Sequence, residues 1–144
     1  MSEYPLPGYH FQVEWGGTRL GFAEVSGLNI EVEVIEYREG THAEYSAKKM
    51  PGIPKYSNIT LKRGILAGDN EFFDWVKTVQ LNKVERRDLV ISLLNENHEP
   101  AMVWKAKNAF PVKLEGPILK ATGSEVAIET LEIAHEGLSI ESEG

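Results

Sequence analysis

The chain has 144 residues, no cysteine and a net charge of −7 at neutral pH, so it can bury the core of a single domain without disulfides or thiolate chemistry. Its acidity argues against sequence-specific nucleic-acid binding, which needs a concentrated basic surface. The first residues contain neither a basic nor an apolar signal region, and no apolar run approaches the length of a membrane span, so we expect synthesis in the cytoplasm without a signal peptide.

Two strands joined by a tight turn begin the predicted fold. Tyr9–Trp15 alternates bulky apolar residues with polar ones, which is the two-residue period of a half-buried strand. Gly16-Gly17 permits the positive φ angles of a hairpin turn, and Leu20–Val25 is the predicted return strand. Ser26-Gly27 ends that strand.

The strongest local pattern lies between Gly27 and Gly40. Apolar residues occupy one side of its two-residue period and polar residues the other, which predicts a long strand with its apolar side in a core and its acidic side in water. The phase of the alternation slips after Val34, so we expect a bulge there that switches the buried face. The two sides comprise Leu28, Ile30, Val32 and Val34 against Asn29, Glu31 and Glu33.

A long loop is predicted next, from residue 40 to residue 55, because this segment contains Pro51-Gly52 and Pro54 and shows no usable period. A loop of this length is uncommon in a compact domain unless it has a function. Alternation resumes over Tyr56–Gly64, where Ile59 and Leu61 oppose polar neighbours and predict a further strand.

A single helix is predicted to begin at Asp69, which would act as its N-cap and is followed by acidic residues in the first turn. The helix is expected to end near Leu81 or Asn82 and to pack as a lid on a sheet. Its predicted apolar stripe consists of Phe72, Phe73, Val76 and Val79.

The remaining sequence predicts more strands. Leu89–Leu94 is almost continuously apolar, Asn95–Pro100 has the composition of a turn, and Ala101–Lys107 returns as the second strand of a hairpin. Phe110–Lys120 is interrupted by a Gly-Pro pair, and the final strand, Glu125–His135, hands its apolar positions from one side to the other. About eight antiparallel strands and one helix indicate a mostly β, α+β domain spanning residues 1–144, built as a sandwich or barrel.

Charge is segregated along the chain. Residues 1–44 hold eight acids and two bases, residues 45–120 hold eight acids and thirteen bases, and residues 121–144 hold six acids and no base. Such blocks either pair within one folded chain or form complementary patches that meet between copies.

Patterns for catalysis, metal ligation and cofactor binding are not found in the sequence. The histidines lie far apart without metal-ligand spacing, and strand alternation places Glu129 on the face opposite Glu132 and Glu136. The glycines at 16–21 lie between strands and begin no helix, so they do not form a phosphate loop. We therefore expect no catalytic residue, no metal site and no cofactor; the four histidines are His10, His42, His98 and His135.

A family resemblance rests on the run Lys49–Gly64, which resembles the signature of the T4-like phage tail tube protein family, including the inner tube proteins of extracellular contractile injection systems. Further blocks are similar to those of the same family at the same relative places, so that the resemblance covers nearly the whole chain. These blocks are Glu24–Leu28, Tyr37–Gly40, Arg86–Asp88, Asn108–Pro111 and Glu125–Glu129.

The resemblance implies a structural protein and no enzyme: a small β-sandwich with one helix that closes as a hexameric ring, with strands from all copies forming one continuous barrel around a channel. Such rings stack into the inner tube of a contractile phage tail or of a phage-tail-like injection system. The implied partners are other copies of the chain, sheath, baseplate or spike and terminator proteins, and DNA or protein cargo in the channel. The implied location is the virion tail or an extracellular particle, after synthesis in the bacterial cytoplasm.

Two sets of residues are candidates for these contacts. Channel-lining candidates are the polar faces of the two strands that flank the long loop, namely Asn29, Glu31, Glu33, Asn58, Thr60 and Lys62. Subunit-interface candidates come from the loop itself, whose apolar and basic side chains suit a buried contact with another copy. They are Tyr45, Lys48, Lys49, Met50, Ile53 and Lys55.

Three alternatives remain open at this point. The chain could be a monomeric barrel that binds a small apolar ligand, with its acidic faces merely solvated. An enzyme with a site assembled from scattered carboxylates is a further reading. The loop could also fold back on its own domain as a lid instead of contacting another copy.

Overall fold

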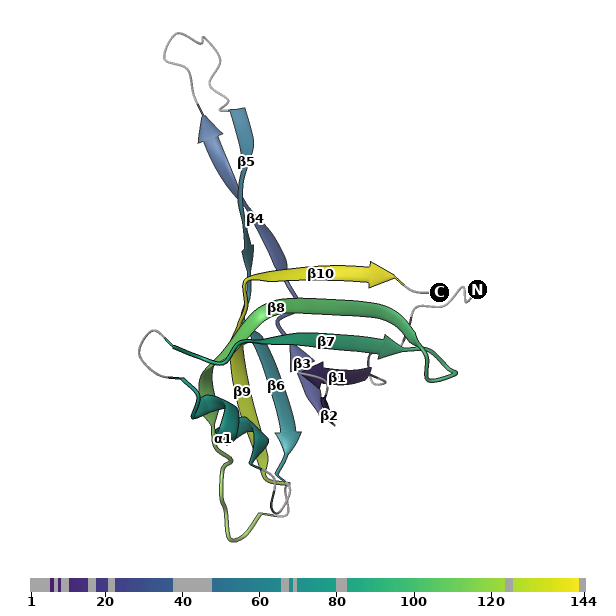
Figure 1. Cartoon of the computed structure of the whole chain (residues 1–144), viewed down its shortest axis with the longest axis vertical. Helices are drawn as coiled ribbons and strands as arrows, with labels where there is room; N and C mark the ends of the chain where they lie inside the picture. Colours follow the sequence, from purple (N-terminus) through teal and green to yellow (C-terminus); the bar gives the residue numbers. More distant parts are fainter. Residues whose placement is uncertain are drawn as a thin grey trace.

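The computed structural model describes residues 6, 8, 11–15, 18–20, 23–37, 48–65, 68, 70–79, 83–123 and 126–142. Within them the chain forms ten strands and one short helix, and Figure 1 shows a body of crossed strands from which one long hairpin projects. In chain order the elements are β1 Phe11–Trp15, β2 Thr18–Leu20, β3 Glu24–Ser26, β4 Ile30–Tyr37, β5 Lys48–Tyr56, β6 Ile59–Gly64, α1 Glu71–Val76, β7 Arg87–Leu94, β8 Pro100–Glu115, β9 Ile128–Ala134 and β10 Gly137–Ser142.

The body consists of two antiparallel layers that share strand β8. The first layer runs in the order β2-β1-β7-β8-β10, and the second in the order β3-β6-β9-β8. The amino-terminal part of β8 pairs with β7 and β10, whereas its carboxyl-terminal part pairs with β9. Strands of the two layers cross one another (Figure 1), which is the arrangement of an orthogonal sandwich. The predicted mostly β fold with one helix is confirmed.

The core between the layers is built around an aromatic cluster. Trp15 on β1 lies 4.8 Å from Trp75, ring centre to ring centre and edge to face, and 5.6 Å from Phe72. Both helix residues are fully buried, so the helix contributes its bulk to the core. The two layers supply aliphatic side chains around this cluster: Val13, Ile59, Leu61, Leu89, Ile91, Leu131 and Ile133.

Two arginines are incorporated into this core. The Nε atom of Arg63 lies 2.8 Å from Oε1 of Glu129, and its guanidinium stacks 4.1 Å from the ring centre of Phe72. Arg87 lies over the ring of Trp75 at 5.1 Å. Because a buried charge is tolerated only when it is paired, the ion pair explains how a carboxylate enters the inner face of β9.

This pairing corrects the predicted change of face in the final strand. The register of β9 with β6 is uninterrupted from Ile128 to Ile133, so Glu129 lies on the buried side together with Leu131. Ile128 lies instead on the opposite, exposed side. The prediction failed because it assumed that every apolar residue faces the core and that no acidic residue does.

The helix is shorter than predicted and buries a different stripe. It ends at Val76, and its amino-terminal cap position is Asn70; the predicted cap, Asp69, lies outside the described residues. Phe73 and Val79 are exposed, whereas Trp75 is buried. Residues 72, 75 and 76 share one face of a helix, so the stripe follows helical spacing with tryptophan in place of the second phenylalanine.

The amino-terminal hairpin is confirmed by the pairing of Trp15 with Thr18, although Gly16-Gly17 itself lies outside the described residues. The predicted return strand is divided, because β2 pairs with β1 in the first layer while Val25 pairs with Leu61 in the second. Ala101–Lys107 and Phe110–Lys120, predicted as separate strands, belong largely to the single strand β8. Strand β10 was not predicted.

The aromatic cluster leads to a stability prediction. Replacing Trp75 with alanine should lower the free energy of unfolding by about 3–5 kcal/mol, because it leaves a cavity next to Trp15. The matched change Phe73→Ala on the same helix should alter it by no more than about 0.5 kcal/mol, since Phe73 is 53% exposed. Urea unfolding of dispersed protein measures both, and equal losses would contradict the packing described here.

Candidate assembly surfaces

Strands β4 and β5 form a two-stranded ribbon that projects from the body (Figure 1, top), here called the ribbon. Every side chain of β4 is exposed, so the predicted burial of its apolar side does not occur within one chain. The predicted loop from residue 40 to residue 55 is also corrected, because Lys48–Tyr56 is a strand. The prolines obscured its period, yet proline is tolerated on a strand with an open edge, and each strand of a two-stranded ribbon has one.

A bulge interrupts the ribbon near the position where the alternation slips. Val32 pairs with Pro54 and Val34 pairs with Pro51, so the extra residue belongs to β5 rather than to β4. Gly52 lies opposite Glu33, where an added Cβ would come within 2.9 Å of the Glu33 carbonyl oxygen. The predicted bulge therefore exists, but one or two residues earlier and in the partner strand.

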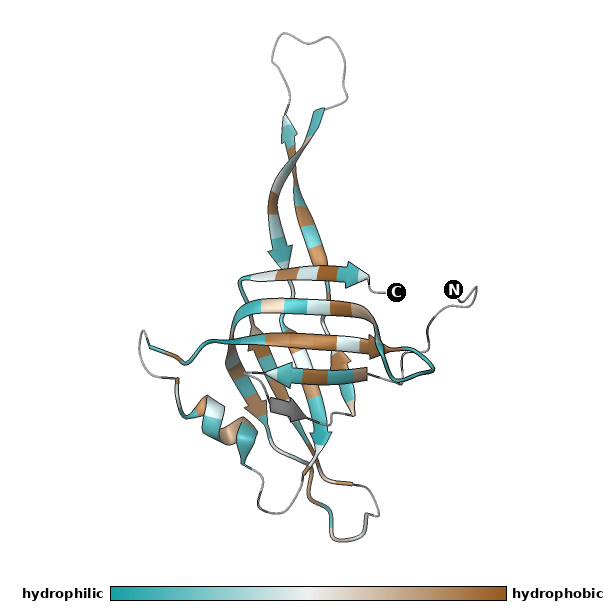
Figure 2. Ribbon diagram, turned by 45° about the vertical axis from the view of Figure 1, so that its right-hand side comes forward, coloured by the Kyte–Doolittle hydropathy of each residue, from teal (hydrophilic) through white to brown (hydrophobic). Residues whose placement is uncertain are grey.

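Both faces of the ribbon carry apolar side chains, as the brown bands in Figure 2 show. Near the body they lie on one face, with Ile30, Val32 and Val34; toward the tip they lie on the other, with Ile35 and Tyr37. Two-stranded ribbons twist strongly, so a change of face midway keeps an apolar stripe on one side of the twisted ribbon.

The interface candidates lie on this ribbon, apart from Tyr45, which is outside the described residues. Ile53 is 73% exposed and Met50 is 50% exposed, so neither is covered by its own chain. The alternative in which the segment folds back as a lid is therefore wrong for these two residues. The basic candidates Lys48, Lys49 and Lys55 are exposed on β5 as well, and Lys55 lies 3.8 Å from Glu33 across the ribbon.

A second surface is the polar outer face of the second layer. Two rows of side chains cross its strands, and they line a hollow of about 250 Å³. Lys62 lies 3.3 Å from Glu24, and Lys113 lies 2.7 Å from Glu115. The rows are Ser26, Thr60, Glu132 and Lys113, and Glu24, Lys62, Thr130 and Glu115.

The charges on this face are matched to one another. The hydrogen bond with Glu115, reinforced by the carboxylate charge, raises the pKa of Lys113 above its usual value. The same hydrogen bond lowers the pKa of Glu115. Both groups are thus held in their charged forms at neutral pH, and the face presents alternating signs instead of a uniformly acidic surface.

The structure divides the predicted channel candidates between two places. Thr60 and Lys62 lie on the polar face of the second layer, and Asn58 is next to it, with Nδ2 donating to Oε1 of Glu132 at 2.9 Å. Glu31 and Glu33 belong to the ribbon. Sequence reasoning missed the contribution of β8 and β9, although the alternation of Thr130 and Glu132 with Leu131 and Ile133 carries the signal.

The second layer has two lateral edges that are unpaired in the described part of the chain. One is the outer edge of β3, which pairs with β6 on its other side. The other is the carboxyl-terminal part of β8, whose pairing with β7 ends at Ala109 while its pairing with β9 continues to Glu115. Open edges of this kind template pairing with another chain.

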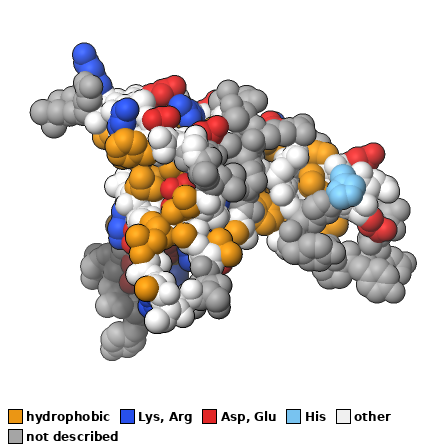
Figure 3. Space-filling view, turned by 90° about the horizontal axis from the view of Figure 1, so that it is seen from below, with side chains coloured by type: hydrophobic (Ala, Val, Ile, Leu, Met, Phe, Trp, Pro, Cys, Tyr) orange, Lys and Arg blue, Asp and Glu red, His pale blue; other side chains and the backbone are white. Residues whose placement is uncertain are grey.

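At the end of the molecule opposite the ribbon, the connection between β8 and β9 exposes further aliphatic side chains (Figure 3, viewed from below). Ile118 is 81% exposed and Leu119 is 82% exposed. Exposed apolar surface is therefore concentrated at the two ends of the long axis.

Features of catalytic or metal sites were also sought. Among the described residues, no group of three histidine or acidic side chains is arranged to hold a metal ion. His135 contacts the backbone, with Nε2 3.1 Å from the carbonyl oxygen of Ser57. In the same part of the chain, no helix has the length and apolar character needed to cross a membrane.

Comparison with known proteins identifies close structural relatives. A chain of the PVC sheath–tube complex, from an extracellular contractile injection system in its extended state, is 39% identical with a TM-score of 0.90, over 97% of this chain and 93% of the other. A chain of the anti-feeding prophage tube-terminating cap is 38% identical with a TM-score of 0.92, over 99% and 95% of the two chains. Hcp1 from Flavobacterium johnsoniae, at 15% identity and a TM-score of 0.58 over 94% and 97%, shares the fold.

Comparison with curated proteins gives no match. The family model for the T4-like virus tail tube protein gp19 matches residues 7–139, which is most of the chain. The resemblance carried by Lys49–Gly64 and the other blocks is therefore confirmed. With its crossed sandwich and single helix, this chain belongs to the T4-like virus tail tube protein family.

Proposed function

We propose that this protein forms the inner tube of a contractile phage-tail-like injection system, as hexameric rings that stack around a channel for protein or DNA cargo. The observation that carries the proposal is the ribbon, whose apolar side chains are exposed on both faces and have no cover within their own chain. An exposed apolar surface of this extent marks a contact with another molecule. Family membership and the relatives from sheath–tube and cap assemblies support a structural, non-catalytic role.

The channel wall is assigned to the second layer. Its inner face is occupied by the core, and its outer face is a continuous polar surface bounded by two open edges. Joining the β3 edge of one copy to the Phe110–Glu115 edge of the next would continue the sheet around a closed ring and leave no edge exposed. A contact between different surfaces that closes produces a ring.

The ribbon is assigned to contacts between copies. Met50 and Ile53, together with the aliphatic residues of β4, supply the apolar area, and the lysines of β5 supply basic groups beside it. Pro51 and Pro54 remove two backbone donors from β5, which makes its edge a poor template for another strand. The ribbon therefore contacts its neighbour through its faces.

The wider set of partners follows from the relatives. Their descriptions name a sheath–tube complex, a sheath/tube terminator and a tube-terminating cap. We infer that sheath, baseplate and terminator proteins contact this tube, and that the mature protein resides in a phage tail or an extracellular particle.

A monomeric ligand-binding barrel is the less favoured alternative. The space between the two layers is filled by the cluster of Trp15, Phe72 and Trp75. A hollow of about 440 Å³ on β7, β8 and β10 includes charged residues such as Asp88, Lys105 and Glu136 in its lining, which does not suit an apolar ligand.

The first prediction of this proposal concerns assembly. Purified protein should form rings or filaments because its largest apolar surface is satisfied only by other copies. Light scattering and negative-stain microscopy across protein and salt concentrations measure this. A protein that stays at the 16.1 kDa of one chain under all conditions would argue for the monomeric barrel.

The second prediction concerns the ribbon. The double change of Met50 and Ile53 to serine should abolish tubes while changing the stability of the dispersed chain by less than about 0.5 kcal/mol, because both side chains are exposed there. Phe73→Ser/Val79→Ser, at exposed apolar positions on and just after the helix, is the control and should still assemble. Tubes formed by the ribbon variant would remove the ribbon from the interface.

The third prediction concerns the channel. The chain has no cysteine, so Lys62→Cys and Glu33→Cys can be labelled selectively. In assembled tubes both should react with a small maleimide but not with a bulky polymer maleimide, whereas Glu96→Cys, in the turn between β7 and β8, should react with both. Equal labelling of Lys62→Cys by the bulky reagent would place the second layer on the outside, and the same result for Glu33→Cys would exclude the ribbon from the channel.

A further inference from the structure

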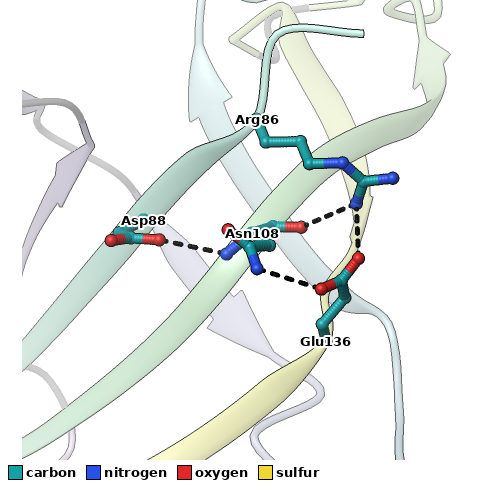
Figure 4. A network of polar contacts seen from close by, with 4 residues as sticks. All are labelled: Arg86, Asp88, Asn108 and Glu136. Carbon is teal, nitrogen blue, oxygen red and sulfur yellow. Dashed lines mark hydrogen bonds and ion pairs between the residues drawn. The ribbon is translucent and has the colours of Figure 1, made fainter. Parts of the chain in front are cut away.

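Four polar side chains meet at the point where β8 leaves the first layer and enters the second. They are Arg86, Asp88, Asn108 and Glu136, here called the clasp (Figure 4). They come from the start of β7, the middle of β8 and the corner between β9 and β10. Residues far apart in the sequence are thus joined at one place.

The backbone is irregular at this point. Arg87 pairs with Ala109 and Leu89 pairs with Ala106, so β8 has one more residue than β7 opposite Asp88. Asn108 occupies this bulge with a φ of 52°. Asparagine tolerates this left-handed conformation better than most residues, and a bulge bends the strand that contains it.

Hydrogen bonds from Asn108 reach all the other members of the clasp. Its backbone N–H donates to Oδ1 of Asp88 at 3.0 Å, and its side-chain Nδ2 donates to Oε2 of Glu136 at 2.9 Å. Its carbonyl oxygen accepts from Nη1 of Arg86 at 3.3 Å. The conformation of the bulge is therefore fixed from three directions.

Glu136 connects the bulge to the corner between β9 and β10. Its Oε1 accepts from Nη1 of Arg86 at 2.9 Å, and its backbone N–H donates to the carbonyl oxygen of Lys107 at 3.0 Å. The preceding residue, His135, contacts the carbonyl oxygen of Ser57 through Nε2 and lies 5.5 Å from the ring of Tyr56. Tyr56 is the last residue of the ribbon, so the corner touches both the clasp and the base of the ribbon.

We propose that the clasp is a positioning device that fixes the direction of the ribbon relative to the body. The contacts run from Asp88 and Asn108 through Glu136 and His135 to Ser57, and each link is a hydrogen bond or a covalent neighbour. The ribbon is held at its base only, so a small rotation there is magnified at its tip. Arg86, Asn108 and Glu136 thereby act on assembly without contacting another copy.

The exposure of the clasp separates this role from a purely stabilising one. The side chains of Arg86 and Glu136 are 43% and 51% exposed, and ion pairs exposed to this degree contribute little to the stability of a fold. Their geometric effect does not depend on a large contribution to stability, because it requires only that one arrangement of the corner be preferred over others.

The test uses two clasp variants and a matched control. Glu136→Gln removes the ion pair while keeping the shape, and Asn108→Gly keeps the backbone conformation while removing the side-chain bond to Glu136. Glu141→Gln is the control, because Glu141 forms a comparably exposed ion pair with Lys105 at 3.1 Å on the same layer, away from the corner.

The decisive measurement is made on dispersed protein and does not require assembly. Spin labels on Glu36→Cys, in the ribbon, and on Glu96→Cys, in the body, report the distance between the two parts by pulsed electron resonance. We expect a single narrow distribution for the unmodified chain and for Glu141→Gln, and a distribution broadened at least about twofold for both clasp variants, because the corner then samples several orientations. Thermal unfolding of the same samples should show closely similar midpoints.

Assembly is the second measurement, and it rests on the proposed function. The clasp variants should raise the protein concentration needed for tube formation by about tenfold, the equivalent of one charged hydrogen bond per copy. Tubes that do form should show altered rise and twist by cryo-electron microscopy.

The outcomes are distinct. Unchanged distance distributions in both clasp variants would overturn the positioning role, whatever happens to assembly. Broadened distributions in a protein that never assembles would retain the clasp as the device that orients the ribbon and would contradict the proposed tube. A fall in the unfolding midpoint with no broadening would reduce the clasp to a stabilising contact and overturn the proposal.

Discussion

The continuity of β8 through both layers constrains the rest of the structure. A regular strand as long as Pro100–Glu115 would leave the first layer and run into solvent, but bulges at Lys107/Asn108 and at Val112 turn it into the second. The angle between the layers then defines the space that Trp15, Phe72 and Trp75 fill. The same turn brings the corner between β9 and β10 to the base of the ribbon, so that core shape and ribbon direction share one origin.

Apolar burial in this protein is divided between the body and a contact outside the chain. The body buries a continuous core, and that core accounts for a stable fold at about 25 cal/mol per Å² of apolar surface removed from water. The ribbon buries none of the side chains of β4. Its apolar residues therefore contribute little to folding of one chain and are free to stabilise the contact between copies. Separating the two functions lets a tube subunit fold before it assembles.

Charge follows the same division. Within the body, Arg63 and Glu129 are paired beside Phe72, where burial demands a partner for each. On the outer face of the second layer, Lys62, Lys113 and their acidic neighbours alternate in sign. If this face lines the channel, a passing polymer meets a wall of compensated charge, so the acidity of the whole chain is a poor guide to the character of the channel.

The sequence by itself determined the family and those strands in which side-chain alternation and burial coincide, such as Phe11–Trp15 and Ile59–Gly64, because local periodicity is enough to specify which side is buried. Tertiary structure decided the rest. Lys48–Tyr56 becomes a strand only because β4 pairs with it, and Glu129 faces inward only because Arg63 lies opposite. Asn108 joins two predicted strands into one because residues from β7 and the β9–β10 corner hold its left-handed conformation. Each of these depends on a partner distant in sequence, which no local pattern contains.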